Sequence, residues 1–186
     1  MSTENPAASA FIEVAKAVVI AAVLSIGLNM FVLQVVDVRQ SSMETTLDEG
    51  DRLILSKVDY RFTAPQRGDI IVFRPPPAAC PLEASQCVPF VKRVIGLAGD
   101  RVDIRDGKVY LNDAALTEHY VRSPTAPEGD TIHYPYTVPN DSVFVLGDNR
   151  PVSGDSRAWG AVSRESILGK AYVDFWPIVH AKWLVP

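Results

Sequence analysis

Hydrophobic positions form one long run near the N-terminus. Residues 17–36 contain no charged side chain. As a helix, this run rises about 30 Å, which matches the hydrocarbon thickness of a bilayer. Glu4 and Glu13 are atypical of the basic leader of a cleavable signal peptide, and no small-residue cleavage site closes the run. The pattern therefore predicts a retained transmembrane anchor at residues 17–36, behind an N-terminal tail at residues 1–16.

Beyond this run the pattern changes to short apolar segments of strand length, separated by Gly, Pro, Asn and Asp. Asp106-Gly107 is a strong hairpin signal, because glycine readily takes the positive φ that such a turn needs. The expected strands are Arg52–Val58, Asp69–Phe73, Phe90–Ile95, Arg101–Ile104, Val109–Leu111, Ser142–Leu146 and Ala171–Phe175. We expect loop or extended structure at Ser123–Asn140. The sequence predicts a mainly β fold, with an antiparallel β-barrel-like domain at residues 37–186 that hangs from one N-terminal transmembrane helix.

Composition and charge exclude some classes of function. The chain has 186 residues and a formal net charge of −4, and it has no evident basic face, so no nucleic-acid partner is expected. Its three histidines show no ligand spacing to its two cysteines, and we expect no metal. Cys80 and Cys87 flank a short loop. A disulfide between them would imply an exported domain, and two unpaired thiols are the alternative.

Two side chains form a candidate catalytic pair. Ser42 lies a few residues beyond the apolar run, and Lys92 lies in the strand-like stretch 88–97. A lysine can activate a serine only if its ammonium loses its proton near neutral pH, and desolvation among apolar side chains favours that loss. On a strand, Lys92 shares one face with Phe90 and Val94. The alternatives are a plain turn serine and a lysine whose head reaches water.

Four segments resemble the conserved boxes of bacterial type I signal peptidases, and they occur in the order of that family. The Phe-Trp-Pro near the C-terminus also resembles the usual ending of the family. The four segments are Ser42–Leu47, which resembles Ser-Met-x-Pro-Thr-Leu; Gly68–Phe73, which resembles Gly-Asp-Ile-Val-Val-Phe; Val91–Asp100, which resembles the lysine box; and Gly147–Gly160, which resembles the last box with its Gly-Asp-Asn-Arg and Ser-Gly-Asp-Ser-Arg.

The resemblance implies a serine endopeptidase of the cell membrane that removes signal peptides from exported preproteins on the extracytoplasmic side. It implies that Ser42 is the nucleophile, that Lys92 is the general base and that the Ser153 hydroxyl orients the lysine amine. The backbone N–H of Ser42 would supply part of the oxyanion hole. The expected partners are signal peptides and the lipid bilayer, with no cofactor.

The resemblance also carries expectations for neighbouring positions. Gln40 stands where many relatives have a serine that completes the oxyanion hole, and its amide is a competent donor; Ser41 is the alternative. Thr45 stands where the family usually has proline, so a less rigid turn is expected there. By the same resemblance, the substrate pocket is lined by Met43, Leu47, Val72, Phe90 and Val91. Structural ion pairs and turn caps that fix the loop of Ser153 are expected from Arg93, Asp148, Arg150, Asp155 and Arg157, with direct contact to substrate as the alternative.

Two other functions fit parts of the pattern. One is a dedicated maturation peptidase of a pilus or conjugation system, which would use the same chemistry. The other is a catalytically inactive, membrane-tethered β module that binds peptides. The joint presence of Ser42, Lys92 and Ser153 disfavours the inactive module, because a binding groove needs none of them.

Overall fold

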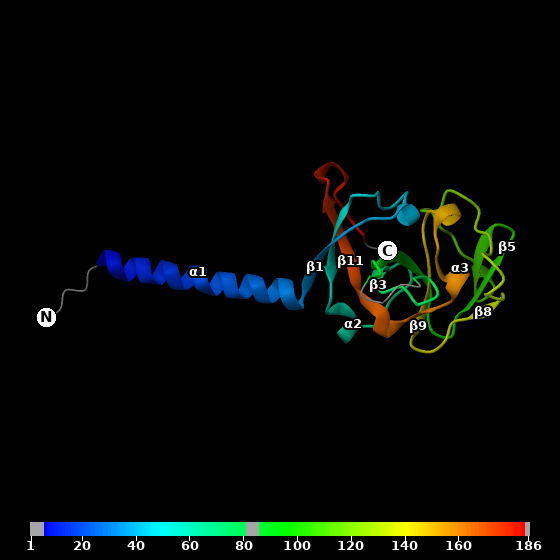
Figure 1. Cartoon of the computed structure of the whole chain (residues 1–186), viewed down its shortest axis with the longest axis horizontal. Coiled ribbons are helices and arrows are strands. Elements are labelled where there is room, and N and C mark those ends of the chain that lie inside the picture. The colour runs from blue at the N-terminus through cyan, green and yellow to red at the C-terminus, as the bar shows by residue number, and fades with distance from the viewer. Residues whose placement is uncertain (1–5, 81–85, 185–186) are drawn as a thin grey trace.

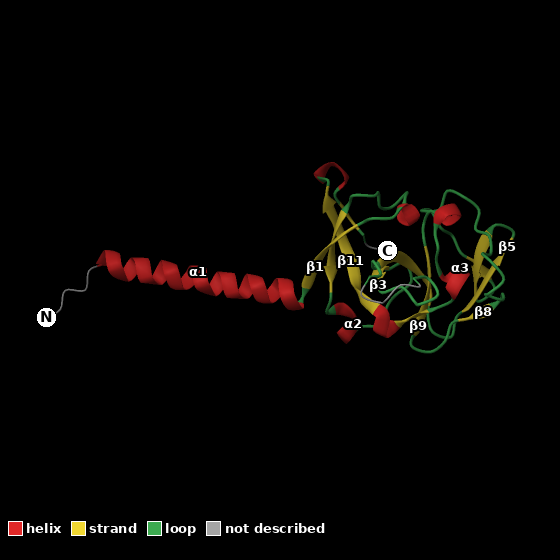
Figure 2. Cartoon of the chain, viewed as in Figure 1, coloured by secondary structure: helices red, strands yellow, loops and turns green. Residues whose placement is uncertain are grey.

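The computed structural model describes residues 6–80 and 86–184. A long helix, α1 (Pro6–Phe31), projects away from a β domain that contains the rest of the described chain (Figure 1). Strands and loops dominate that domain, and its helices are short (Figure 2). The mainly β, antiparallel class predicted from the sequence is confirmed.

The helix differs from the predicted anchor at both ends. It begins at Pro6, inside the expected tail, whose residues 1–5 lie outside the described residues. It ends at Phe31, and the last part of the apolar run belongs to strand β1 (Leu33–Asp37), which pairs with β2 (Arg52–Ser56). A charge-free run does not mark the boundary between helix and strand, because apolar residues suit both. Among the described residues, no helix has both the length and the apolarity needed to cross a membrane.

The larger sheet has the strand order β1-β2-β11-β3-β4-β9-β10, and β12 pairs with β11. Neighbouring strands in this sheet are antiparallel. Its central strand β3 is buried at every position, as its continuous Ile-Ile-Val-Phe run indicates. The remaining strands of this sheet are β3 (Ile70–Phe73), β4 (Phe90–Gly96), β9 (Ser142–Leu146), β10 (Val162–Ser163), β11 (Ile167–Trp176) and β12 (Lys182–Trp183).

The smaller sheet has the order β7-β6-β5-β8. The predicted hairpin joins β5 to β6, and its two turn residues have φ angles of 52° at Asp106 and 74° at Gly107. Positive φ at both positions is the signature of the turn that matches strand twist. The strands are β5 (Arg101–Arg105), β6 (Lys108–Leu111), β7 (Ala114–Ala115) and β8 (Tyr136–Thr137), the last of which lies in the stretch expected to be loop.

Short helical segments complete the fold. The helices α2 and α3 have four residues each, and the 3₁₀ helices have three. None was predicted, because a single turn is too short to show helical periodicity. They are α2 (Asp59–Phe62), α3 (Ser156–Trp159), η1 (Ser41–Met43), η2 (Arg150–Val152), η3 (Arg164–Ser166) and η4 (Ile178–His180).

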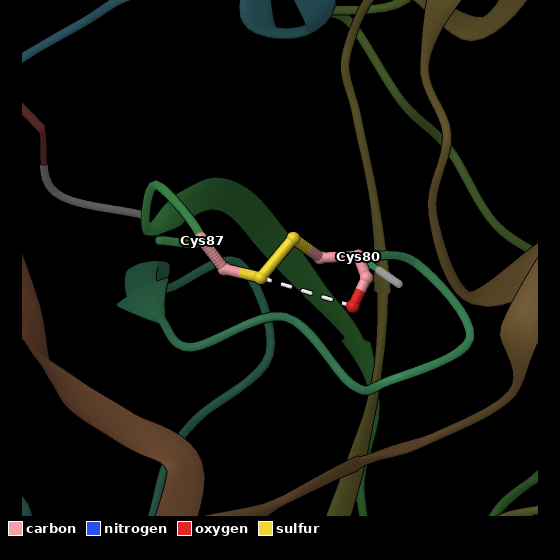
Figure 3. Close-up of a disulfide and its surroundings, with 2 residues drawn as sticks. All are labelled: Cys80 and Cys87. Carbon is pink, nitrogen blue, oxygen red and sulfur yellow. Dashed lines mark hydrogen bonds between the residues drawn. A yellow bond between two sulfur atoms is a disulfide. The ribbon is translucent and has the colours of Figure 1, made fainter. Parts of the chain in front are cut away.

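A disulfide bond joins Cys80 to Cys87 in the connection between β3 and β4 (Figure 3). Their Cα atoms are 6.1 Å apart, a separation that a disulfide spans readily. The bond decides between the two states that the sequence left open. It closes the connection shortly before β4, which begins at Phe90 and carries Lys92.

Candidate active site

Ser42 lies in the 3₁₀ helix η1, a few residues after β1. Its neighbour Met43 is 1% exposed and packs into a core cluster with Val38 and Leu47. The packing of Met43 in the core holds the 3₁₀ turn that carries Ser42. Ser42 itself is 6% exposed.

Lys92 lies in β4, opposite Ile71 of β3, and its side chain is almost completely buried. Its Nζ is 2.6 Å from the Oγ of Ser42 and 5.2 Å from the centre of the Phe90 ring. Burial lowers the pKa of Lys92 from 10.5 to about 8, because the ammonium loses its water; Asp155 opposes this effect and Arg157 adds to it. The structure thus brings together the two residues that the sequence pairs, and it places an easily deprotonated amine beside the serine.

Ser153 is buried in the loop that follows β9, but it does not make the expected contact. Within the described part of the chain, its Oγ has no hydrogen-bond partner and donates nothing to Lys92. A Cβ at Gly147 would lie 2.2 Å from the Oγ of Ser153 and 2.4 Å from the carbonyl oxygen of Ser42. Only glycine therefore allows this strand end to pass between the two serines, which brings Ser153 near the candidate site.

Charged side chains hold the Ser153 loop in place. The guanidinium of Arg157 pairs with Asp155 at 2.8 Å and donates to the carbonyl oxygens of Arg150 and Ser153 at 2.7 and 2.9 Å. Asp155 also accepts from the backbone N–H of Gly147 at 3.1 Å. The expected structural role of these residues agrees with these contacts.

A second pair ties the strand of Lys92 to the end of β9. Arg93 pairs with Asp148 at 2.7 Å, and Thr46 donates to the same carboxylate at 2.5 Å. Arg150 pairs with Glu118 at 2.5 Å. Buried polar contacts at Asp148 therefore join three parts of the chain: the segment after Ser42, strand β4 with Lys92, and the last box.

A cavity of about 460 Å³ opens beside the pair. Ser42, Lys92 and Phe90 line it, together with Gln40 and Ser41, the two candidates for a second oxyanion donor. The structure thus places both candidates at the cavity and does not choose between them.

The predicted pocket residues fall into two groups. Phe90 lines the cavity beside the pair. Met43 and Val91 border a smaller depression of about 10 Å³ next to Ser42, and both also belong to a core cluster. Leu47 and Val72 are buried in the same cluster and border neither space. Their place in the pocket remains a prediction.

Thr45 occupies the family's proline position in an unusual conformation. Its φ is 91°, a region that β-branched residues rarely adopt and that proline cannot reach. Its hydroxyl donates to the carbonyl oxygen of Tyr120 at 2.5 Å. The turn after Ser42 is thus held by a contact to a distant loop, and not by the ring of a proline.

Asn149 is a contact residue of the site to which sequence reasoning assigned no role. Its backbone N–H donates to the carbonyl oxygen of Ser42 at 3.1 Å. Its side-chain Nδ2 donates to the carbonyl oxygen of Ser41 at 3.1 Å and to Glu44 at 2.9 Å. Its position beside Asp148 in the last box was the available signal.

The fold and this pair define a class: a mainly β protein in which a buried lysine contacts a serine beside a cavity. Residues 11–176 match the family described as signal peptidase, peptidase S26. A probable signal peptidase I-2 from Synechocystis is 43% identical over 94% of this chain and 78% of its own length. Signal peptidase I from Leptolyngbya laminosa is 42% identical over 95% of this chain and 85% of its own length. A solved signal peptidase I from Enterococcus faecalis is 32% identical, with a TM-score of 0.42 over 58% of this chain and 97% of its own.

The extent of the family match and the identity of the two bacterial relatives decide the family. The chain belongs to the peptidase S26 family of signal peptidases and is a serine endopeptidase.

Proposed function

We propose that this chain removes signal peptides from exported preproteins, with Ser42 as nucleophile and Lys92 as general base. The observation that carries the proposal is the 2.6 Å contact between Nζ of Lys92 and Oγ of Ser42, both buried beside a cavity. A pKa of about 8 leaves a useful fraction of Lys92 uncharged near neutral pH. A neutral amine at this distance accepts the serine proton directly.

In acylation, Oγ of Ser42 attacks the scissile carbonyl carbon while its proton passes to Nζ of Lys92. The carbonyl oxygen becomes an oxyanion, which the N–H of Ser42 and the amide of Gln40 stabilise. When the C–N bond breaks, the Lys92 ammonium gives its proton to the leaving amine. The signal peptide is then an ester on Ser42, and the mature protein leaves with a free amino group.

In deacylation, neutral Lys92 takes a proton from a water molecule, which attacks the ester carbon. Ser42 leaves with that proton, and the signal peptide departs as a carboxylic acid, which loses its remaining proton to solvent. In this scheme the unpartnered Ser153 hydroxyl binds the lysine amine during the reaction and holds it in line. The absence of a competing partner among the described residues supports that role.

The substrate lies in the cavity, with the residue before the scissile bond in a shallow apolar pocket. Phe90 contributes to this pocket from the cavity, and Met43 and Val91 contribute from the adjoining depression. Leu47 and Val72 support the pocket from the core. Because the depression is small, we expect cleavage after small residues.

We also propose that α1 anchors the chain in the cell membrane, with the β domain on the extracytoplasmic side. The helix stands clear of the β domain (Figure 1), and its side chains at residues 11–25 are exposed: Phe11 is 74% and Leu24 is 67% exposed. Such a surface is stable only in a nonpolar environment. The Cys80–Cys87 disulfide supports an oxidising compartment. Extraction of membranes at alkaline pH tests the anchor: the chain should stay in the pellet, and a double Val19→Lys, Val23→Lys variant should not.

The test of the activity uses the full chain in detergent and a secretory precursor. The expected result is one new N-terminus, found by sequencing, immediately after a small residue. Ser42→Ala and Lys92→Ala should each remove nearly all cleavage, because nucleophile and base act as a unit. Ser142→Ala, at the half-buried start of β9, and Lys108→Ala, at the exposed start of β6, are the matched controls. Cleavage by either active-site variant above a few per cent of wild type would refute the assignment.

A further inference from the structure

The Ser41–Ser42 peptide unit is held by a side chain from a distant loop. Its carbonyl oxygen accepts from Nδ2 of Asn149 at 3.1 Å, in addition to the Glu44 N–H that closes the 3₁₀ turn at 3.1 Å. This unit is a trans peptide, so its carbonyl and its N–H point in opposite directions. The N–H at its other end belongs to Ser42. Whatever fixes the Ser41 carbonyl therefore also fixes the direction of the Ser42 N–H.

Glu44 sets the orientation of the Asn149 amide. The two hydrogens of Nδ2 serve two acceptors, the Ser41 carbonyl oxygen and Oε2 of Glu44, which lies 2.9 Å from Nδ2. If the amide were flipped, its oxygen would face a carboxylate and a carbonyl oxygen, and both contacts would be repulsive. The carboxylate of Glu44 thus selects the orientation in which Asn149 donates to Ser41.

The backbone of Asn149 contributes a second, independent contact. Its N–H donates to the Ser42 carbonyl oxygen at 3.1 Å. Gly147 also lies close to this carbonyl oxygen. Truncation of the Asn149 side chain leaves this backbone contact in place. It removes one of the two hydrogen bonds that hold the Ser41 carbonyl and leaves the Glu44 N–H bond, while the position of Ser42 itself is kept.

We infer that Asn149, oriented by Glu44, is a positioning residue that aims the Ser42 N–H at the oxyanion of the reaction. The inference rests on the proposed function, because it concerns the transition state of that reaction. Asn149 does not line the cavity, so it acts through the peptide and not on substrate. The first N–H groups of a helical turn have no partner within the turn, which leaves the Ser42 N–H available for the oxyanion.

Four variants of the full chain in detergent test the inference, with a precursor peptide as substrate. Asn149→Ala should lower kcat about 10- to 100-fold, which is less than the 10²–10³-fold cost of losing a whole oxyanion donor. KM should change less than about two-fold, because the donor acts only as charge develops. Asn149→Asp should be worse, since a carboxylate would face both Glu44 and the Ser41 carbonyl. Glu44→Ala should cost a few-fold, whereas Glu44→Gln keeps an acceptor and should stay near wild type.

Two further readouts separate aiming from a general loosening of the site. A peptide aldehyde forms a reversible adduct with Ser42 that places its oxygen at the oxyanion position, so its affinity should fall in parallel with kcat across the variants. The pH at which activity rises should not move, because Lys92 and Ser42 keep their contact. Asn140→Ala, in the exposed turn that precedes β9, is the control and should match wild type on all counts.

Wild-type cleavage in the same assay distinguishes the two levels of the proposal. If the wild type does not cleave the precursor, the proposed function fails. If the wild type cleaves and Asn149→Asp keeps kcat within two-fold, the inference is overturned. A loss confined to KM, or a shift of the pH profile with unchanged aldehyde affinity, would also overturn it. Glu44→Ala keeps the test decisive if an Asn149 variant does not fold.

Discussion

Replacement of Lys92 by methionine should make the folded protein more stable at neutral pH, although it removes the proposed base. Lysine and methionine have similar length and no branches, so the substitution leaves no large cavity. What changes is the charge. A buried ammonium has lost its water and gains little in return, and it therefore opposes folding.

The size of the effect follows from the pKa of Lys92, which burial lowers from 10.5 to about 8. A shift of this size corresponds to about 3 kcal/mol of destabilisation while the folded-state lysine is charged. Loss of the contact with the Ser42 hydroxyl costs about 1 kcal/mol in the opposite direction. We therefore expect Lys92→Met to raise the free energy of unfolding by about 2 kcal/mol at neutral pH.

The pH dependence gives the sharper test. The folded-state pKa lies below that of the unfolded chain, so unfolding takes up a proton between about pH 8 and 10.5. The penalty is complete below about pH 8, decreases as the pH rises towards 10.5, and is gone above 10.5, where both states are neutral. The advantage of methionine should disappear over the same range.

Urea unfolding of the full chain in detergent micelles, followed by tryptophan fluorescence, measures this difference. Lys108→Met, on the exposed side of β6, is the matched control and should differ from wild type by less than about 0.5 kcal/mol. A Lys92→Met protein that is less stable than wild type at neutral pH would refute the reasoning. So would an advantage that persists unchanged at about pH 11.

Three further outcomes are expected. Wild-type kcat/KM should rise with pH through a limb near 8, since only neutral Lys92 can accept the serine proton; a limb near 10 in a pH–rate profile would contradict this. In urea unfolding, Thr45→Pro should lower stability by about 1–3 kcal/mol, because proline cannot adopt the φ of 91°; Thr45→Gly should cost less, because relief of the positive φ offsets the lost hydroxyl contact to Tyr120, and a proline variant more stable than wild type would contradict this. Burial, with Asp51 beside it, raises the pKa of Asp174 from 3.8 to about 6, so wild type should lose stability as the pH rises through 6; melting temperatures should show a smaller loss in Asp174→Asn.

The local sequence pattern predicted a strand well where turn residues bound the strand on both sides. Ser142–Leu146 was predicted with its observed bounds, because a short apolar run between turn residues has the length of a strand and is too short for a typical helix. Leu33–Val36 was assigned to the anchor, since an apolar run continuous with a helix looks the same whether it ends as helix or as strand. The pairing with β2 that decides the matter is not local.

The site could be predicted only in part for the same reason. Ser42 and Lys92 are 50 residues apart, and their pairing was expected because the resemblance supplied it; the contact itself depends on sheet register. The side chain of Asn149 contacts residues 108 and 105 positions away, and no pattern along the chain records such contacts. The expected Ser153–Lys92 hydrogen bond is not formed in the structure, and the position of a loop side chain relative to a distant strand is not specified by local sequence.

The charges near Lys92 are arranged in pairs, and this arrangement lets burial determine its pKa. Asp155 raises the pKa of Lys92 and its partner Arg157 lowers it, so their effects oppose each other. Asp155→Asn should therefore shift the activity limb to lower pH, because the positive charge of Arg157 is no longer opposed. Asparagine keeps one acceptor oxygen, which can still cap α3 but cannot also accept the Gly147 N–H that the other oxygen of Asp155 binds, so the melting temperature of the variant must be measured alongside its activity. Profiles of kcat/KM against pH for wild type and variant measure the shift; a limb that stays in place or moves to higher pH would show that the pairs do not tune the lysine.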